Sequence, residues 1–199
     1  MYSPPHHEGE LRPLNDAGGV LAIRARVSKA AFGDRLISNH LRGLVAEAIV
    51  AAALEPVWTW CSADWAGWDF ERADGLKLEV KQSASRQTWA PDGGSETACR
   101  FDIRARTGSY IGSQWRAKHG RIADVYVFAH HFEVAASADH CDPTQWRFFA
   151  VAERCLPQTK TIGLRGVQKL ADPCSFTGLA DAVDDCTSRI VIEPTAYEV

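Results

Sequence analysis

The first apolar pattern along the chain runs from Asp34 to Leu54 and has the spacing of a helix. Gly33-Asp34 supplies a candidate N-cap, and Pro56 ends the segment because proline cannot continue a helix. Residues 1 to about 20 are rich in proline and glycine and predict an irregular tail, so a single domain is expected over residues 21–199. The apolar stripe of the predicted helix consists of Leu41, Leu44, Val45, Ala48 and Ala52.

Shorter apolar runs follow this helix and predict strands. The segment Asp124–His131 is a continuous apolar run, which is typical of a strand buried on both faces. Gly108–Gly120 fits either a loop or a short helix, and Phe176–Cys186 predicts a C-terminal helix. This order of elements predicts an α/β fold with a mixed central β-sheet flanked by helices. The other predicted strands are Val57–Trp60, Trp68–Arg72, Leu76–Ser83, Arg100–Ala105 and Gln145–Val151.

Two of these strands flank a turn and are expected to form a hairpin. A two-residue turn at Asp74-Gly75 would mix polar and apolar residues on both faces of the hairpin. A three-residue loop, Ala73-Asp74-Gly75, with its glycine in the left-handed conformation, instead pairs Asp69 with Glu79. We favour this register because burial selects the pairing that collects apolar residues on one face. That face carries Trp68, Phe70, Leu76, Leu78 and Val80, and the opposite face carries Asp69, Glu71, Lys77, Glu79 and Lys81.

The polar face of this hairpin carries a D-x9-E-x-K motif formed by Asp69, Glu79 and Lys81. Two adjacent carboxylates repel each other, and a divalent cation between them removes that repulsion. Oxygen ligands favour a hard ion, so Mg²⁺ or Mn²⁺ is expected. The alternative is a solvated polar face whose charges are neutralised by Lys77 and Lys81.

Glu47 is the only charged side chain between Leu44 and Leu54. Burying a charge without a partner is costly, so Glu47 either points to water or faces something positive. A helix packed against the hairpin could bring Glu47 to the metal, and Gly43 one turn earlier would allow a close approach. The alternative is an exposed glutamate on an alanine-rich helix.

A helix with a glutamate, a strand with an aspartate and a strand with E-x-K together resemble the PD-(D/E)XK, or restriction-endonuclease-like, nucleases. Asp69, Glu79, Lys81 and Glu47 match the motif positions, although Gly67-Trp68 precedes the aspartate where the motif has proline. The resemblance implies a restriction-endonuclease-like core of αβββαβ type over residues 34–131. A narrower resemblance links L-E-V-K-Q-S-A-S-R-Q-T-W, A-D-V-Y-V-F and Q-W-R-F-F-A-V to a bacterial family within this superfamily, and it leaves the substrate open.

The resemblance implies that Asp69 and Glu79 bind Mg²⁺, with the Val80 carbonyl as a possible third ligand. Lys81 would orient or deprotonate the attacking water or stabilise the pentacovalent phosphorus. Glu47 would hold a second metal or a metal-bound water. The cation would lower the pKa of bound water and offset charge on the scissile phosphate.

Further polar and aromatic residues are candidate substrate contacts. Each has a structural alternative: polar residues at a strand end, a tryptophan in the core, or a solvated strand face of arginines. His130 and His131 at the end of the buried strand could be catalytic, although a strand-end pair is more often structural. The candidate contacts are Gln82, Ser83, Gln87, Trp89, Arg100, Arg104 and Arg106.

The formal net charge is −3, so the protein as a whole is not basic. Basic residues nevertheless gather between Arg100 and Arg121. This segment contains six basic residues and a single acid, Asp102, and such segregation could give a basic face. The six cysteines contain no C-x2-C pair, which argues against zinc and favours reduced thiols. The polar N-terminus resembles no signal peptide and no segment approaches a membrane span, so a cytoplasmic protein is expected.

The leading hypothesis is a Mg²⁺-dependent endonuclease that acts on DNA in restriction, repair or defence. One alternative is a catalytically silent nucleic-acid-binding domain of the same fold, and another is an RNA-cleaving enzyme. Cutting both strands of a duplex would favour a homodimer, although no sequence feature indicates one.

Overall fold

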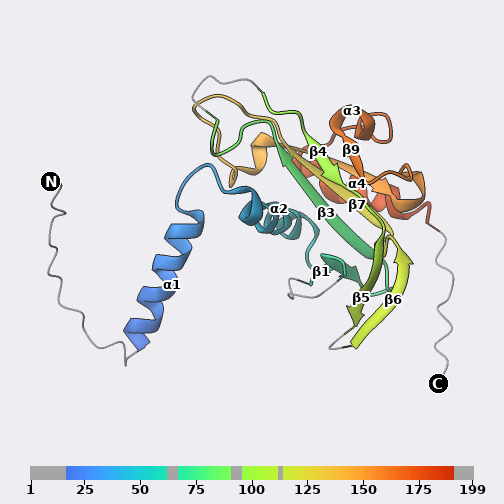
Figure 1. The fold of residues 1–199 in the computed structure, drawn as a ribbon, viewed down its shortest axis with the longest axis horizontal. Coiled ribbons are helices and arrows are strands. Elements are labelled where there is room, and N and C mark those ends of the chain that lie inside the picture. The colour runs from blue at the N-terminus through green and yellow to red at the C-terminus, as the bar shows by residue number, and fades with distance from the viewer. Residues whose placement is uncertain (1–16, 62–66, 91–95, 112–113, 191–199) are drawn as a thin grey trace, which may run out of the picture. The chain divides into compact units, whose positions relative to one another are not determined.

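The computed structural model describes residues 17–61, 67–90, 96–111 and 114–190 (Figure 1). The chain divides into two compact units, Met1–Asp34 and Arg35–Val199. The first unit contains helix α1, Ala17–Phe32, which the sequence does not predict. The tail expected over residues 1–20 lies outside the described residues up to position 16, and α1 occupies the rest of it.

The second unit is built on a five-stranded mixed sheet with the order β1-β2-β3-β7-β8. The two long strands β3 and β7 are parallel, and every other neighbouring pair in this sheet is antiparallel. All residues of β7 are buried, which confirms the expectation of a strand covered on both faces. The strands are β1, Trp58–Trp60; β2, Phe70–Arg72; β3, Lys77–Ala84; β7, Val125–His131; and β8, Trp146–Ala152.

Two small antiparallel sheets and several short helices complete this unit. Strand β4 is shorter than predicted, and Gly108–Gly120 is neither a loop nor a helix but the larger part of a two-stranded ribbon, β5–β6. The helical elements after the sheet are η1, Pro143–Gln145; η2, Glu153–Cys155; α3, Leu164–Val167; η3, Phe176–Gly178; and α4, Leu179–Thr187. The paired strands are β4, Arg100–Asp102, with β9, Thr161–Gly163; and β5, Arg106–Ile111, with β6, Gln114–Gly120.

The central sheet is covered on both faces. Helices α2 and α4 contact each other and pack on β3, β7 and β8, on the face that carries Leu78 and Val80. The other face of β7 and β8 belongs to a second cluster, which includes residues from β4 and β9. The fold is therefore α/β with a mixed sheet flanked by helices, as predicted. That second cluster includes Phe101, Tyr126, Phe128, Phe149, Val151 and Ile162.

Helix α2 spans Asn39–Leu54, so the predicted start at Asp34 and the N-cap at Gly33-Asp34 are wrong. The N–H of Gly33 donates to the carbonyl of Lys29, so this glycine follows the end of α1 rather than preceding α2. The predicted stripe is also wrong, because α2 is apolar around most of its circumference and Leu44 is 42% exposed. Its buried residues are Arg42, Val45, Ala46, Ile49, Val50, Ala51 and Leu54.

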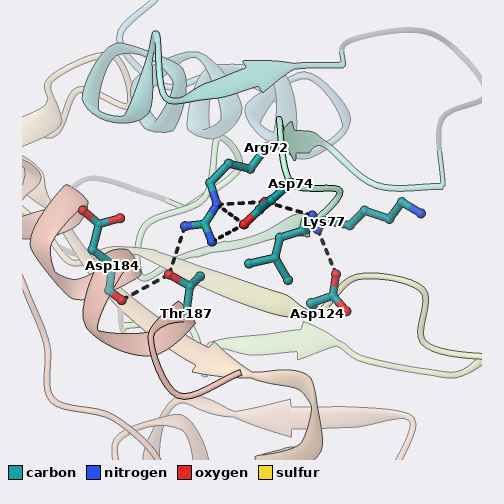
Figure 2. A network of polar contacts seen from close by, with 7 residues as sticks. Arg72, Asp74, Lys77, Asp124, Asp184 and Thr187 are labelled. Atoms are coloured by element: carbon teal, nitrogen blue, oxygen red, sulfur yellow. Dashed lines mark hydrogen bonds and ion pairs between the residues drawn. The ribbon is translucent and has the colours of Figure 1, made fainter. Parts of the chain in front are cut away.

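Polar contacts hold the β2–β3 turn against the rest of the unit (Figure 2). The Arg72 guanidinium forms an ion pair with Asp74 at 2.7 Å and donates to the Thr187 hydroxyl of α4 at 3.2 Å. The backbone N–H of Lys77 donates to Asp124 just before β7 at 2.9 Å. These contacts join the β2–β3 turn to α4 and to the residue before β7, which are distant from it in the sequence.

Candidate active site

The hairpin register is the one that the apolar pattern predicts. Phe70 pairs with Leu78, and Arg72 donates its N–H to the carbonyl of Leu76 at 2.9 Å. Three residues therefore form the loop, and Gly75 has a φ of +88°, in the region that favours glycine. The alternative two-residue turn at Asp74-Gly75 is wrong.

The apolar face of the hairpin is buried with one exception. Phe70, Leu76, Leu78 and Val80 are all at most 7% exposed. Trp68 is half-buried instead, and the Lys77 ammonium lies 4.1 Å from the centroid of its ring. The expected place of Trp68 on the core face is wrong. Strand β2 begins only at Phe70, so the alternation of side chains along a strand does not apply to Trp68.

Asp69 lies directly before β2 and is held against β3. Its backbone N–H donates to the carbonyl of Leu78 at 3.0 Å, and its carboxylate accepts the N–H of Val80 at 2.6 Å. These two bonds place Asp69 beside the stretch of β3 that contains Glu79. A charge-assisted bond to a strand N–H orients the carboxylate without using a side chain of β3.

The carboxyl of Asp69 has an unusual proton affinity. Burial raises its pKa, and the negative charges of Glu79 and Glu47 raise it further, to about 7. The Val80 N–H and the Lys81 ammonium oppose this rise only in part. The pKa of Glu47 is also raised, first by burial and then by the charge of Glu79. Three acids from α2, the residue before β2 and β3 therefore repel one another within a poorly solvated region.

Lys81 forms an ion pair with Glu79, two residues earlier on the same face of β3. The side chains remain 19% and 15% exposed, so solvent reaches both. Lys81 thus lies beside one of the three acids, and it is the cation that lowers the pKa of both Asp69 and Glu47.

Glu47 is half-buried on α2, and its carboxylate accepts a hydrogen bond from the Trp60 indole N–H at 3.2 Å. The Trp60 ring stacks on Phe70, with 6.4 Å between centroids, and this joins α2 to the hairpin. The alternative of a fully exposed glutamate is wrong. The close approach expected at Gly43 is not seen, since a Cβ there would meet only the Glu47 carboxylate, at 4.0 Å.

A divalent cation fits the chemistry of these groups, because all three offer oxygen ligands and all three gain from added positive charge. Within the described residues, however, no group of three or more His, Cys, Asp or Glu side chains is arranged to hold a metal ion. The expected binding of Mg²⁺ or Mn²⁺ by Asp69, Glu79 and Glu47 therefore stays a prediction.

Gln87 is buried and Gln82 is half-buried, and both are hydrogen-bonded to Arg42. Arg42 is 1% exposed and donates to the amide oxygens of Gln82 at 2.7 Å, Gln87 at 3.1 Å and Asn39 at 2.7 Å. Gln87 also donates to the carbonyl of Ala84, and Ser83 is buried. The amide oxygens of both glutamines accept hydrogen bonds from Arg42, so neither oxygen is left without a partner inside the protein.

Sequence reasoning missed Arg42, although a signal was present. Arg42 precedes Val45, Ala46 and Ile49 at helical spacing, so it lies on the buried face of α2. Burial lowers its pKa to about 10. A charged side chain is normally exposed to solvent. The Arg42 guanidinium is buried because it donates hydrogen bonds to three amide oxygens inside the protein.

The aromatic and basic candidates do not share one strand. Trp89 is 71% exposed, so the alternative that it belongs to the core is wrong. Arg100 is on β4, Arg104 follows that strand and bonds to Asp102, and Arg106 begins β5. The expected single strand face of three arginines is therefore wrong.

The two histidines at the end of β7 are buried and engaged in the protein interior. The ring of His130 bonds to the Ser85 hydroxyl at 2.9 Å. The ring of His131 bonds to the Gln145 amide oxygen at 3.1 Å and packs edge-on against His140. Burial lowers the pKa of all three histidines, in keeping with structural roles.

All six cysteines are free thiols, as predicted. In the part of the chain that the structure describes, no helix has the length and apolar character needed to cross a membrane. A comparison with models of known protein families and a comparison with curated proteins find no match. The resemblance to the PD-(D/E)XK nucleases rests on the motif and therefore stays a prediction.

Proposed function

We propose that the protein is a metal-dependent nuclease of the restriction-endonuclease-like type that hydrolyses phosphodiester bonds, with DNA as the favoured substrate. The observation that carries the proposal is the placement of Asp69 against β3, where burial first and then the charges of Glu79 and Glu47 raise its pKa to about 7. A buried carboxyl whose pKa is shifted by its surroundings is a candidate functional group, and carboxylate oxygens are the ligands that a hard cation prefers.

Asp69 and Glu79 would hold Mg²⁺ or Mn²⁺, and Glu47 would hold a second ion or an ordered water. A bound cation supplies a water of lowered pKa and neutralises charge on the scissile phosphate. The carbonyl of Val80 is the remaining candidate ligand, because the N–H of the same residue already orients Asp69.

Lys81 would act on the water and the phosphate rather than on the cation. Its ammonium pairs with Glu79, which keeps it beside the acids while leaving it partly exposed. From that position it can donate hydrogen bonds to the attacking water or to a phosphate oxygen as negative charge develops. The same lysine neutralises Glu79 while no substrate is bound.

A direct test is cleavage of supercoiled plasmid, linear duplex DNA, single strands and RNA with Mg²⁺ or Mn²⁺. We expect Lys81→Ala to lower the cleavage rate by about a hundredfold or more, as removal of a charge-stabilising donor does. Lys77→Ala is the matched control, because Lys77 lies on the same face of β3 but over Trp68. Equal rates for both variants, or no cleavage of any substrate together with no metal binding by calorimetry, would refute the proposal.

A nucleic-acid-binding domain without catalytic turnover is the second candidate. The observation in its favour is the absence, among the residues described, of a three-ligand acidic cluster. Calorimetric titration with Mn²⁺ separates the two candidates. Binding that Asp69→Asn abolishes favours the nuclease, whereas DNA binding without any metal binding favours the silent domain.

A further inference from the structure

Strand β6 of the β5–β6 ribbon is exposed along almost its whole length. Gln114 through His119 are exposed on both faces of β6, and β5 pairs only with β6 in the described sheets. Figure 1 shows these two strands as a projecting pair. A strand that buries neither face contributes little to a core, so its contribution to the protein is sought elsewhere.

The ribbon keeps its shape through its own contacts. Gly108 is buried beneath Trp115, since a Cβ at that position would come within 2.6 Å of the indole. Trp115 itself remains 50% exposed. At the base of the ribbon, Arg121 donates to the carbonyl of Ile103 at 2.6 Å and pairs with Glu153 at 3.1 Å. The ribbon is thus a stiffened arm with an anchored base.

The free part of this arm is positively charged. The sequence contains no acid between Asp102 and Asp124, although the whole protein is acidic. Arg116 and Lys118 lie on one face of β6, two residues apart, and both are exposed. Arg106 is exposed where β5 begins. Because Arg121 is engaged at the base, the charge available to a partner belongs to these three residues.

We propose that the β5–β6 ribbon is a duplex-DNA-binding arm, with Arg116 and Lys118 contacting phosphates and Trp115 stiffening the strand pair. This inference rests on the proposed nuclease function for the choice of a nucleic acid as ligand. The B-DNA major groove admits a two-stranded β-ribbon, whereas the major groove of duplex RNA is too narrow for one. The arm therefore selects DNA duplexes over RNA duplexes.

The ribbon is followed along the chain by β7, which pairs with the strand that carries Glu79 and Lys81. Gly120 ends β6 shortly before β7, in which Tyr126 pairs with Glu79 of β3. Burial raises the pKa of the Tyr126 hydroxyl and the charge of Glu79 raises it further, whereas the charges of Arg121 and Arg106 lower it.

The test is fluorescence anisotropy of a labelled B-form duplex with the full chain in excess EDTA, so that binding is measured without cleavage. We expect the double variant Arg116→Ala, Lys118→Ala to bind about tenfold more weakly at low salt. Its plot of log affinity against log salt should become shallower by about 1.8, since each lost phosphate contact removes about 0.9. The matched control is Arg165→Ala, Lys169→Ala, which removes two exposed positive charges from another part of the surface.

The outcomes separate this inference from the proposed function. The proposed DNA-binding arm would be refuted if the ribbon variant bound DNA with wild-type affinity. It would also be refuted if the control variant lost as much affinity, or if the wild type bound duplex RNA as tightly as duplex DNA. Ribbon-dependent DNA binding without cleavage under any metal would sustain the arm and refute the nuclease. If the ribbon variant cleaved DNA at the wild-type rate and bound it with wild-type affinity, the nuclease proposal would stand and the DNA-binding arm would be refuted. Thermal unfolding of both variants, expected to match the wild type, excludes misfolding as the cause.

Discussion

At the scale of single residues, Asp69 gives the site its pH dependence. Its pKa is raised from 3.8 to about 7 in the folded protein, so folding takes up a proton between these values. The stabilising effect of that protonation is complete below 3.8 and disappears as the pH rises through about 7. We therefore expect the metal-free wild type to lose stability relative to Asp69→Asn over this range, measured by chemical denaturation. A difference that stays constant with pH would contradict the placement of Asp69 among the acids, and added Mn²⁺ should reduce the loss.

Arg42 makes a different prediction at the same scale. Its replacement by methionine leaves the amide oxygens of Gln82 and Gln87 without their donor, so Arg42→Met should lower the free energy of unfolding by about 3 kcal/mol. Arg35→Met is the control, because Arg35 is exposed, and its effect should stay within about 0.5 kcal/mol. Equal effects in denaturant unfolding would mean that the internal amide network does not stabilise the fold.

At the scale of elements, the β2–β3 hairpin depends on its loop. Gly75→Ala introduces a side chain at a φ of +88°, which should cost about 1 kcal/mol of unfolding free energy. No atom lies within 4 Å of the added methyl, so backbone strain alone is measured. Gly43→Ala is the contrasting control, because alanine in an open helical position should stabilise by about 1 kcal/mol. Destabilisation by both substitutions would point to steric conflict instead of turn geometry.

The same elements show what the sequence could predict. The hairpin register was predictable because a one-residue slip would have moved Phe70 and Leu78 to the wrong face. The β5–β6 ribbon was not, because β6 is exposed on both faces and has no apolar alternation to detect. The start of α2 was misplaced because Gly33 ends one helix only a few residues before the next begins. The buried position of Arg42 was not predicted, because its internal amide partners cannot be recognised before the fold brings them together.

At the scale of the whole molecule, buried histidines oppose the pH effect of Asp69. Burial lowers the pKa of His140 from 6.5 to about 4, and those of His130 and His131 also fall. The unfolded chain therefore binds protons first, and stability is lost as the pH falls from 6.5 through about 4. We expect His140→Gln to lose stability less steeply than the wild type over this range, followed by denaturant unfolding. The exposed His40→Gln should follow the wild type, and identical slopes for all three proteins would contradict the prediction.

The parallel pairing of β3 with β7 has a consequence for how this protein can change. Parallel neighbours cannot be joined by a tight turn, so the chain must leave the sheet after Ala84 and return at Val125. The ribbon lies within that excursion, and its two ends, Arg106 and Gly120, are paired neighbours. The whole arm can thus be shortened, lengthened or exchanged at one point without altering the strands that carry the acids. Recognition and hydrolysis would then be separately adjustable, and one scaffold could acquire new targets by replacing a single hairpin.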